Sequence, residues 1–109
     1  MSDTDRVSLP TIRTHELKTV RPYFGAVWGG EKTAELRKND RGFQVGDLML
    51  LREYLPDEFH YTGYAIRAEI TDIVTDAEGE WLAEGHVMLS FKILDLIMSY
   101  KEPANVTGA

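Results

Sequence analysis

The sequence contains no cysteine, and its three histidines are scattered. Without cysteine the chain has no disulfide bond, no thiolate metal ligand and no cysteine nucleophile. His15, His60 and His86 are not spaced as in a metal-binding motif. We therefore expect neither a metal nor a cofactor.

The sequence also lacks long apolar runs. No stretch approaches the roughly 18 apolar residues of a membrane-spanning helix, and MSDTDRVSLP at the N-terminus lacks the profile of a signal peptide. These absences predict a cytoplasmic protein with no membrane partner. The 109 residues suffice for one domain. We expect a loose N-terminal segment at 1–12, the domain at 13–93 and a C-terminal extension at 94–109.

Negative charge dominates the chain, but it is unevenly distributed. The net charge is -6, yet residues 13–52 hold eight Lys and Arg against five acids, whereas residues 53–109 hold three against eleven. An anion-binding surface must come from the first half, because the second half repels long polyanions such as duplex nucleic acid. The pattern favours a small or local anionic ligand, with solvated faces as the alternative.

Side-chain patterns and the turns between them predict five strands and one helix. The helix is expected in RPYFGAVWGG, where Pro22 suits the first helical position and two glycines supply the stop. Within TAELRK, Ala34 and Leu36 are expected to face the core, and Glu35 and Arg37 the solvent. This order of elements predicts a mainly β fold with one or two helices, arranged as a small, mostly antiparallel barrel. The expected strands are at 14–19, 33–38, 48–54, 64–75 and 86–93.

The segment GGEKTAELRKNDRGFQVGD gathers cations between two glycine-containing turns. Arg37 offers a planar donor fork that suits a phosphate or a base edge, and Lys32 offers a point charge. Glu35 can accept a base's amino hydrogens. These three side chains are candidate ligand-binding residues. The alternative is an ordinary surface ion pair between Glu35 and Arg37, worth about 0–1 kcal/mol.

Further ligand contacts are expected around this segment. Lys38, Asn39 and Arg41 lie in or beside a turn, where cationic heads and backbone N–H groups can converge on a phosphate. His15 can hydrogen-bond a ligand, and Tyr54 can stack on a base. Each has a structural alternative: a solubilising turn, a buried histidine, or a packed ring.

Four parts of the sequence, HELKT, the helix ending in Gly-Gly, EKTAELRKNDRGFQVGD and LREY, together resemble the ASCH family of PUA-like barrels, nearest to a small bacterial and phage branch. The family's short signature is met by Gly30, Lys32, Glu35 and Arg37, which read GxKxxExR. The resemblance covers about residues 13–93. It implies a five- to six-stranded barrel with a groove beside the helix, in a family proposed to bind RNA or modified nucleosides.

The resemblance thus implies a module that binds RNA or a nucleotide-like ligand. The enzymatic alternative is a small hydrolase, because one ASCH branch hydrolyses the amide of an acetylated cytidine and another member cleaves RNA. If the chain is an enzyme, Lys32, Thr33 and Glu35 are the catalytic candidates, although Glu35 stands where that branch has threonine. The assisting glutamate would be Glu53 or Glu69.

A third alternative is a protein-interaction module. The C-terminal run ILDLIMSY, residues 93–100, extends past the family resemblance and is apolar enough to cover a sheet edge or to form a homodimer contact.

Overall fold

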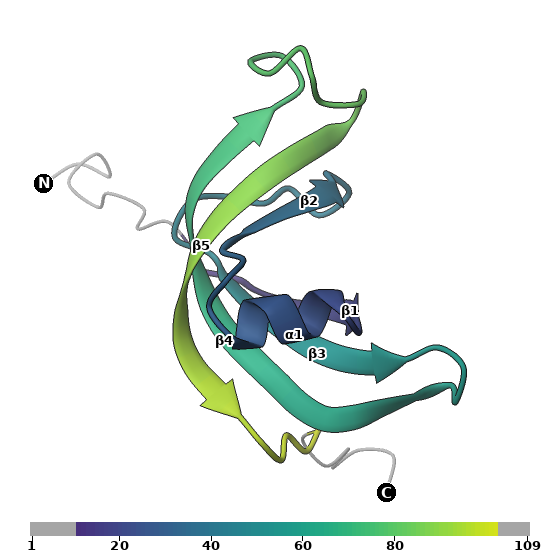
Figure 1. Ribbon diagram of the computed structural model, residues 1–109. Coiled ribbons are helices and arrows are strands. Elements are labelled where there is room, and N and C mark those ends of the chain that lie inside the picture. Colours follow the sequence, from purple (N-terminus) through teal and green to yellow (C-terminus); the bar gives the residue numbers. More distant parts are fainter. Residues whose placement is uncertain (1–10, 103–109) are drawn as a thin grey trace, which may run out of the picture.

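The computed structural model describes residues 11–102, which form one curled five-stranded sheet and one short helix (Figure 1). The mainly β fold with an early helix is confirmed, and each predicted strand is present. No helix within these residues is long and apolar enough to cross a membrane. The elements are β1 (Thr14–Val20), α1 (Tyr23–Trp28), β2 (Ala34–Lys38), β3 (Leu48–Leu55), β4 (His60–Thr75) and β5 (His86–Ile97).

The strands lie in the order β1-β3-β4-β5-β2. Strands β3, β4 and β5 form an antiparallel meander, and β2 adds to it antiparallel to β5, but β1 pairs with β3 in parallel. The parallel pair arises because α1 and β2 lie between β1 and β3 in sequence, a crossover long enough to return the chain in the same direction. The sheet is therefore a mixed half-barrel, which agrees only roughly with the predicted barrel.

Two strands are each four residues longer than predicted. Strand β4 begins at His60, because the turn at 56–59 is tight and Tyr61 already pairs with Tyr54. Strand β5 passes position 93 and ends at Ile97, still paired with β4. The first part of the C-terminal run is thus a strand, and self-association through this run stays a prediction. Its exposed apolar side chains are Leu94, Leu96 and Met98.

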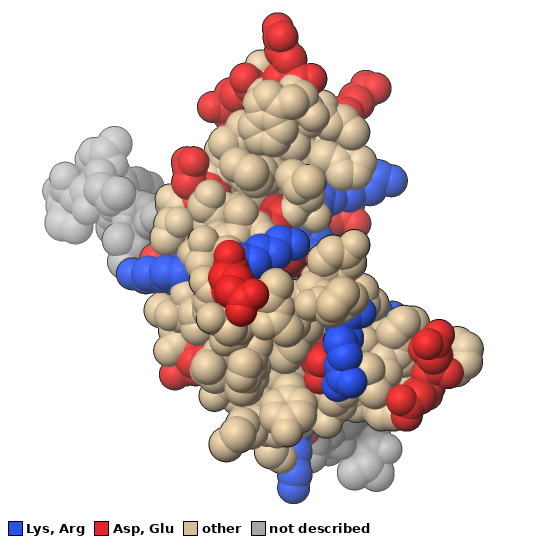
Figure 2. Space-filling model, in the orientation of Figure 1, with Lys and Arg blue, Asp and Glu red and all other residues tan. Residues whose placement is uncertain are grey.

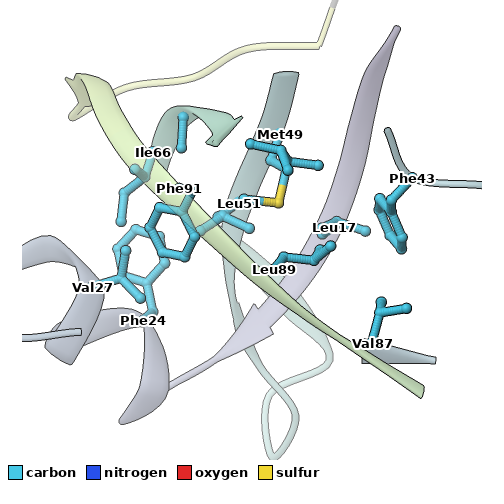
Figure 3. Packing of buried hydrophobic residues seen from close by; sticks show 12 residues of the cluster. Leu17, Phe24, Val27, Phe43, Met49, Leu51, Ile66, Val87, Leu89 and Phe91 are labelled. Atoms are coloured by element: carbon cyan, nitrogen blue, oxygen red, sulfur yellow. The ribbon is translucent and has the colours of Figure 1, made fainter. Parts of the chain in front are cut away.

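The apolar core fills the concave side of the sheet, where α1 lies within the curl (Figure 1). The helix contributes Phe24 and Val27, and Phe43 reaches the same cluster from the loop before β3. Burying side chains of this size stabilises a fold by roughly 1.5–3 kcal/mol each. The labelled members in Figure 3 are Leu17, Phe24, Val27, Phe43, Met49, Leu51, Ile66, Val87, Leu89 and Phe91.

Strand β2 presents the opposite face to the core from the one predicted. Leu36 is 62% exposed, whereas Glu35 is only 5% exposed. Glu35 lies opposite Leu89 in the register with β5, and Arg37 lies opposite Val87, so both polar side chains are on the core side. The prediction that Ala34 and Leu36 face inward is wrong. Because β2 is an edge strand, its inner face also meets the backbone of β1, which polar side chains can hydrogen-bond.

Candidate binding site between the sheet edges

A pocket of about 830 Å³ lies where the edge strands β1 and β2 approach each other. Its size falls within the roughly 300–1,000 Å³ of typical small-molecule sites. The cation-rich segment identified in the sequence forms most of one wall. The lining consists of residues 18–20, Tyr23, residues 31–38, His86 and Met88.

An ion pair at the pocket joins the two sheet edges. Arg37 Nε and Nη2 donate to Glu35 Oε2 at 2.9 and 2.7 Å. Arg37 Nη2 also lies 3.0 Å from the carbonyl oxygen of Lys18 and 3.4 Å from the hydroxyl of Thr19, both on β1. The Glu35 side chain is 6% exposed and that of Arg37 is 26% exposed. The predicted pair is therefore present, but it is largely buried and it bridges strands that form no ladder.

The same pair keeps hydrogen-bonding capacity for a ligand. Within residues 11–102, Glu35 Oε1 accepts no hydrogen bond and Arg37 Nη1 donates none. No fully buried side-chain oxygen or nitrogen in this part of the chain lacks a partner, so Oε1 retains access to solvent. Glu35 therefore keeps a free acceptor oxygen, and Arg37 keeps free donor hydrogens on Nη1, the nitrogen turned away from the carboxylate.

The pocket is cationic although the protein is acidic. Four cationic side chains line it, Lys18, Lys32, Arg37 and Lys38, against two acidic ones, Glu31 and Glu35. None of the three lysines forms an ion pair with another described residue. Acidic side chains gather instead at the tips of the β3–β4 and β4–β5 hairpins, with Lys and Arg side chains between them (Figure 2).

The end of α1 fixes the position of Lys32. Gly30 adopts a left-handed conformation with φ of 79°, which glycine tolerates without strain. The backbone N–H groups of Glu31 and Lys32 then both donate to the carbonyl of Ala26, at 3.0 and 3.1 Å. Lys32 Nζ lies 5.1 Å from the ring centroid of Tyr23, so a cation and an exposed aromatic ring share one wall.

Nine of the fourteen lining residues were not predicted as site residues, among them Lys18, Tyr23, Glu31, His86 and Met88. Lys18 lies on the polar face of β1, Tyr23 begins α1 and Glu31 follows the Gly-Gly pair after it, and none of these positions by itself indicates a ligand contact. His86 and Met88 belong to β5, whose position next to β2 is set by the tertiary fold. Only the pairing of distant strands brings these side chains together.

Lys32, Thr33, Glu35, Arg37 and Lys38 all line the pocket, whereas His15 does not. His15 is 6% exposed, and its ring lies 4.6 Å from that of Phe43. Its Nε2 lies 2.8 Å from Asp47 Oδ2. Burial alone raises the pKa of the Asp47 carboxyl, but the hydrogen bonds from His15 and from two backbone N–H groups together bring that pKa below its usual value. This histidine therefore packs in the core and holds Asp47, and it does not reach the pocket.

Three further candidates lie outside the lining. Arg41 Nη1 donates to the carbonyl of Glu16 at 3.1 Å, and the backbone N–H of Asn39 donates to the carbonyl of Gly85 at 2.8 Å. Tyr54 lies on the outer face of the sheet, with Lys18 Nζ 4.1 Å from its ring centroid. Arg41 thus acts like Arg37 in holding the free edge of β1.

The two glutamates considered as catalytic assistants also lie elsewhere. Glu53 lines a second hollow of about 420 Å³, where Arg21 Nε and Nη2 donate to it at 2.8 and 3.2 Å and Thr62 donates at 2.8 Å. The hydrogen bond from Arg21 holds the pKa of Glu53 below its usual value, against the effect of burial. Glu69 pairs with Lys92 at 3.6 Å.

Comparison with known proteins identifies relatives of this chain. A family model described as a domain of unknown function, DUF3850, matches residues 14–91, a range that contains the whole pocket lining. The chain is 43% identical over 77 residues to an "Uncharacterized 12.9 kDa protein in GpA 3'region" of Escherichia phage P2. That match covers 71% of this chain and 66% of the phage protein, just under two thirds of its length.

Proposed function

We propose that this chain, which belongs to the DUF3850 family, binds RNA or a nucleotide-like ligand in the pocket between β1 and β2. The observation that carries the proposal is the convergence of Lys32, Glu35 and Arg37 on one pocket. The curled sheet with its helix in the hollow also supports a PUA-like module of the ASCH kind.

The lysines suit a phosphate group. Lys18 and Lys38 are exposed, Lys32 is partly exposed, and none of them is neutralised by another described residue. Hydrogen bonds between charged groups are stronger than neutral ones, so a phosphate can engage these ammonium groups at little cost. The acidic hairpin tips repel a long polyanion, which favours one or a few phosphates over a duplex.

The Glu35–Arg37 pair suits the edge of a base. Glu35 Oε1 can accept an amino hydrogen of the base, while Arg37 Nη1 can donate to a separate acceptor of the ligand. Adenine, cytosine and guanine carry an exocyclic amino group, and uracil does not. A well-placed contact of this kind discriminates by about 1–3 kcal/mol, or about 5- to 150-fold. We therefore expect uridine monophosphate to bind most weakly. Tyr23, 57% exposed, offers a stacking surface beside the edge contacts.

Replacing Lys32 with alanine tests the binding proposal. Loss of one charged hydrogen bond removes roughly 1.5 kcal/mol, so affinity for nucleoside monophosphates should fall about tenfold and depend less on salt. Isothermal titration at several salt concentrations measures both. Lys92→Ala is the matched control, because Lys92 is an exposed lysine that lies outside the pocket. The proposal fails if no nucleotide or short RNA binds in a salt-sensitive manner, or if the control weakens binding equally.

A small hydrolase is the second candidate, because Lys32, Thr33 and Glu35 line the same pocket. This reading predicts turnover of N-acetylated cytidine or of RNA, which Lys32→Ala should abolish. Product formation is followed by chromatography at high protein concentration. Absence of turnover would exclude the candidate while leaving the binding proposal intact. Neither Glu53 nor Glu69 lines the pocket, so this candidate has less support.

A further inference from the structure

A row of cationic and aromatic side chains crosses the outer face of the sheet next to the pocket. Arg52 Cζ lies 5.0 Å from the ring centroid of Tyr100 and 3.8 Å from that of Tyr61. The rings of Tyr61 and Tyr54 meet edge to face with centroids 5.0 Å apart, and Lys18 Nζ lies 4.1 Å from the centroid of Tyr54. The row therefore ends at a lysine that also lines the pocket.

The last ring of the row, that of Tyr54, is outside the pocket but next to a residue that lines it. Tyr54 lies beside Val20 in the parallel register of β1 and β3, and Val20 lines the pocket. On the other wall, Lys32 and Tyr23 form a similar pair of ammonium group and ring. The pocket is thus flanked by a lysine–tyrosine pair on each side.

The two cations of the row differ in burial and in the number of ion pairs that they form. Arg52 has a side chain that is 7% exposed, and its Nη1 lies 3.1 Å from Glu16 and 2.6 Å from Glu102. It is held in place, so one face of Tyr61 stays covered. Lys18 is exposed and forms no ion pair with another described residue. Its contact with Tyr54 is therefore the replaceable one.

The energies of the two kinds of contact indicate what can replace Lys18 on the ring of Tyr54. A lysine over an exposed ring contributes about 0.5–1 kcal/mol, whereas a base stacked on an aromatic side chain contributes about 1–3 kcal/mol. A base can therefore displace Lys18 from Tyr54. The displaced ammonium group remains beside the pocket, where it can meet a phosphate.

From this arrangement we propose that the ligand is single-stranded RNA of at least two nucleotides, with one base in the pocket and its neighbour stacked on Tyr54. Lys18 then contacts the phosphate that links them. This inference rests on the proposed function and extends it from a nucleotide to a strand. A duplex does not fit, because its bases are stacked on each other and expose no face to a tyrosine.

The test compares mononucleotides with dinucleotides. Isothermal titration is run with adenosine and cytidine monophosphates and with the matching RNA dinucleotides, on the full chain and on Tyr54→Ala, Tyr54→Phe and Trp81→Ala. The better dinucleotide should bind the full chain about 5- to 150-fold more tightly than its mononucleotide. Tyr54→Ala should remove this gain and leave mononucleotide affinity unchanged, while Tyr54→Phe keeps the gain because it keeps the ring. Trp81, 65% exposed and outside the row, is the matched aromatic control.

The outcomes separate the two proposals. If neither mononucleotides nor dinucleotides bind, the proposed function and this inference both fail. If mononucleotides bind and dinucleotides bind no more tightly, only the strand inference fails. It fails as well if Tyr54→Ala weakens both ligands equally, because Tyr54 then acts on the fold and not on the second base, or if Trp81→Ala removes the gain.

Discussion

Replacing Asp47 with alanine should lower the free energy of unfolding by about 3–5 kcal/mol, because the buried His15 ring and two backbone N–H groups lose their acceptor, at about 1–3 kcal/mol for each unsatisfied group. Asp47 is 1% exposed, and its Oδ2 lies 2.8 Å from His15 Nε2 and 3.1 Å from the backbone nitrogen of Gln44. Its Oδ1 accepts from the backbone N–H of Arg13 at 3.4 Å. One carboxylate thus ties the start of β1 to the turn before β3. Urea titration followed by circular dichroism measures the loss.

A surface aspartate provides the control for this prediction. Asp72 is exposed on β4, so Asp72→Ala should change stability by no more than about 0.5 kcal/mol. Asp47→Asn retains the shape of the side chain and should fall between the two. A loss at position 47 no larger than at position 72 would show that the buried network contributes little.

Acid should weaken the fold through the same carboxylate. The pKa values of Asp47 and Glu53 are both below their usual ranges in the folded chain. A carboxyl group with a depressed folded pKa contributes stability above its unfolded pKa of about 4, and this contribution is lost as the pH falls through the folded value. The free energy of unfolding should therefore fall with pH below about 4. The fall should be shallower in Asp47→Asn, which has no carboxyl group to protonate at that position.

Replacing Arg37 with alanine should separate the two sheet edges and abolish nucleotide binding. The change leaves the Glu35 carboxylate nearly buried without its cation, and it removes the hydrogen bonds to Lys18 and Thr19 on β1. Because Arg37 is partly exposed, we expect a loss of about 2–3 kcal/mol of unfolding free energy, below that of a fully buried pair. Denaturant titration and isothermal titration on the same variant measure the two effects.

Two further substitutions show whether the losses in Arg37→Ala come from the planar guanidinium or from its charge alone. Arg37→Lys keeps the charge but lacks the planar fork, so it should restore little of either property. Arg67→Ala removes an exposed arginine that lies 2.6 Å from Asp95, and such a surface pair contributes only about 0–1 kcal/mol. If Arg37→Lys kept both the stability and the nucleotide affinity of the unchanged chain, charge alone would be needed at this position.

Local pattern was sufficient to predict the elements of this fold. Alternation and the flanking turns located the strands, and the Gly-Gly pair located the end of α1, because side-chain period and backbone freedom are properties of short segments. Alternation separates the two faces of a strand but does not say which one is buried. At β2 the more hydrophobic face, with Leu36, is outside, because the edge position lets Glu35 and Arg37 reach β1.

The candidate site was predictable only in part, for a related reason. Lys32, Glu35 and Arg37 were found because they lie within one short segment, and the Glu35–Arg37 spacing places those two on one face. Lys18 and Tyr23 were missed because they reach the pocket only when β1 approaches β2, which depends on the parallel pairing of β1 with β3. His15 was proposed as a ligand contact, but its partner Asp47 is remote in sequence and was assigned only to a turn.

The parallel pairing of β1 also bears on the order in which the chain folds. Strands β3, β4 and β5 are joined as hairpins and meet through contacts close in sequence, which form rapidly. Strands β1 and β2 pair with strands that are distant from them in sequence. We therefore expect them to join the meander last and to fray first. Most of the pocket lining belongs to these two strands and to the segment that joins them. A ligand that contacts both strands would thus stabilise the part of the molecule that unfolds most readily.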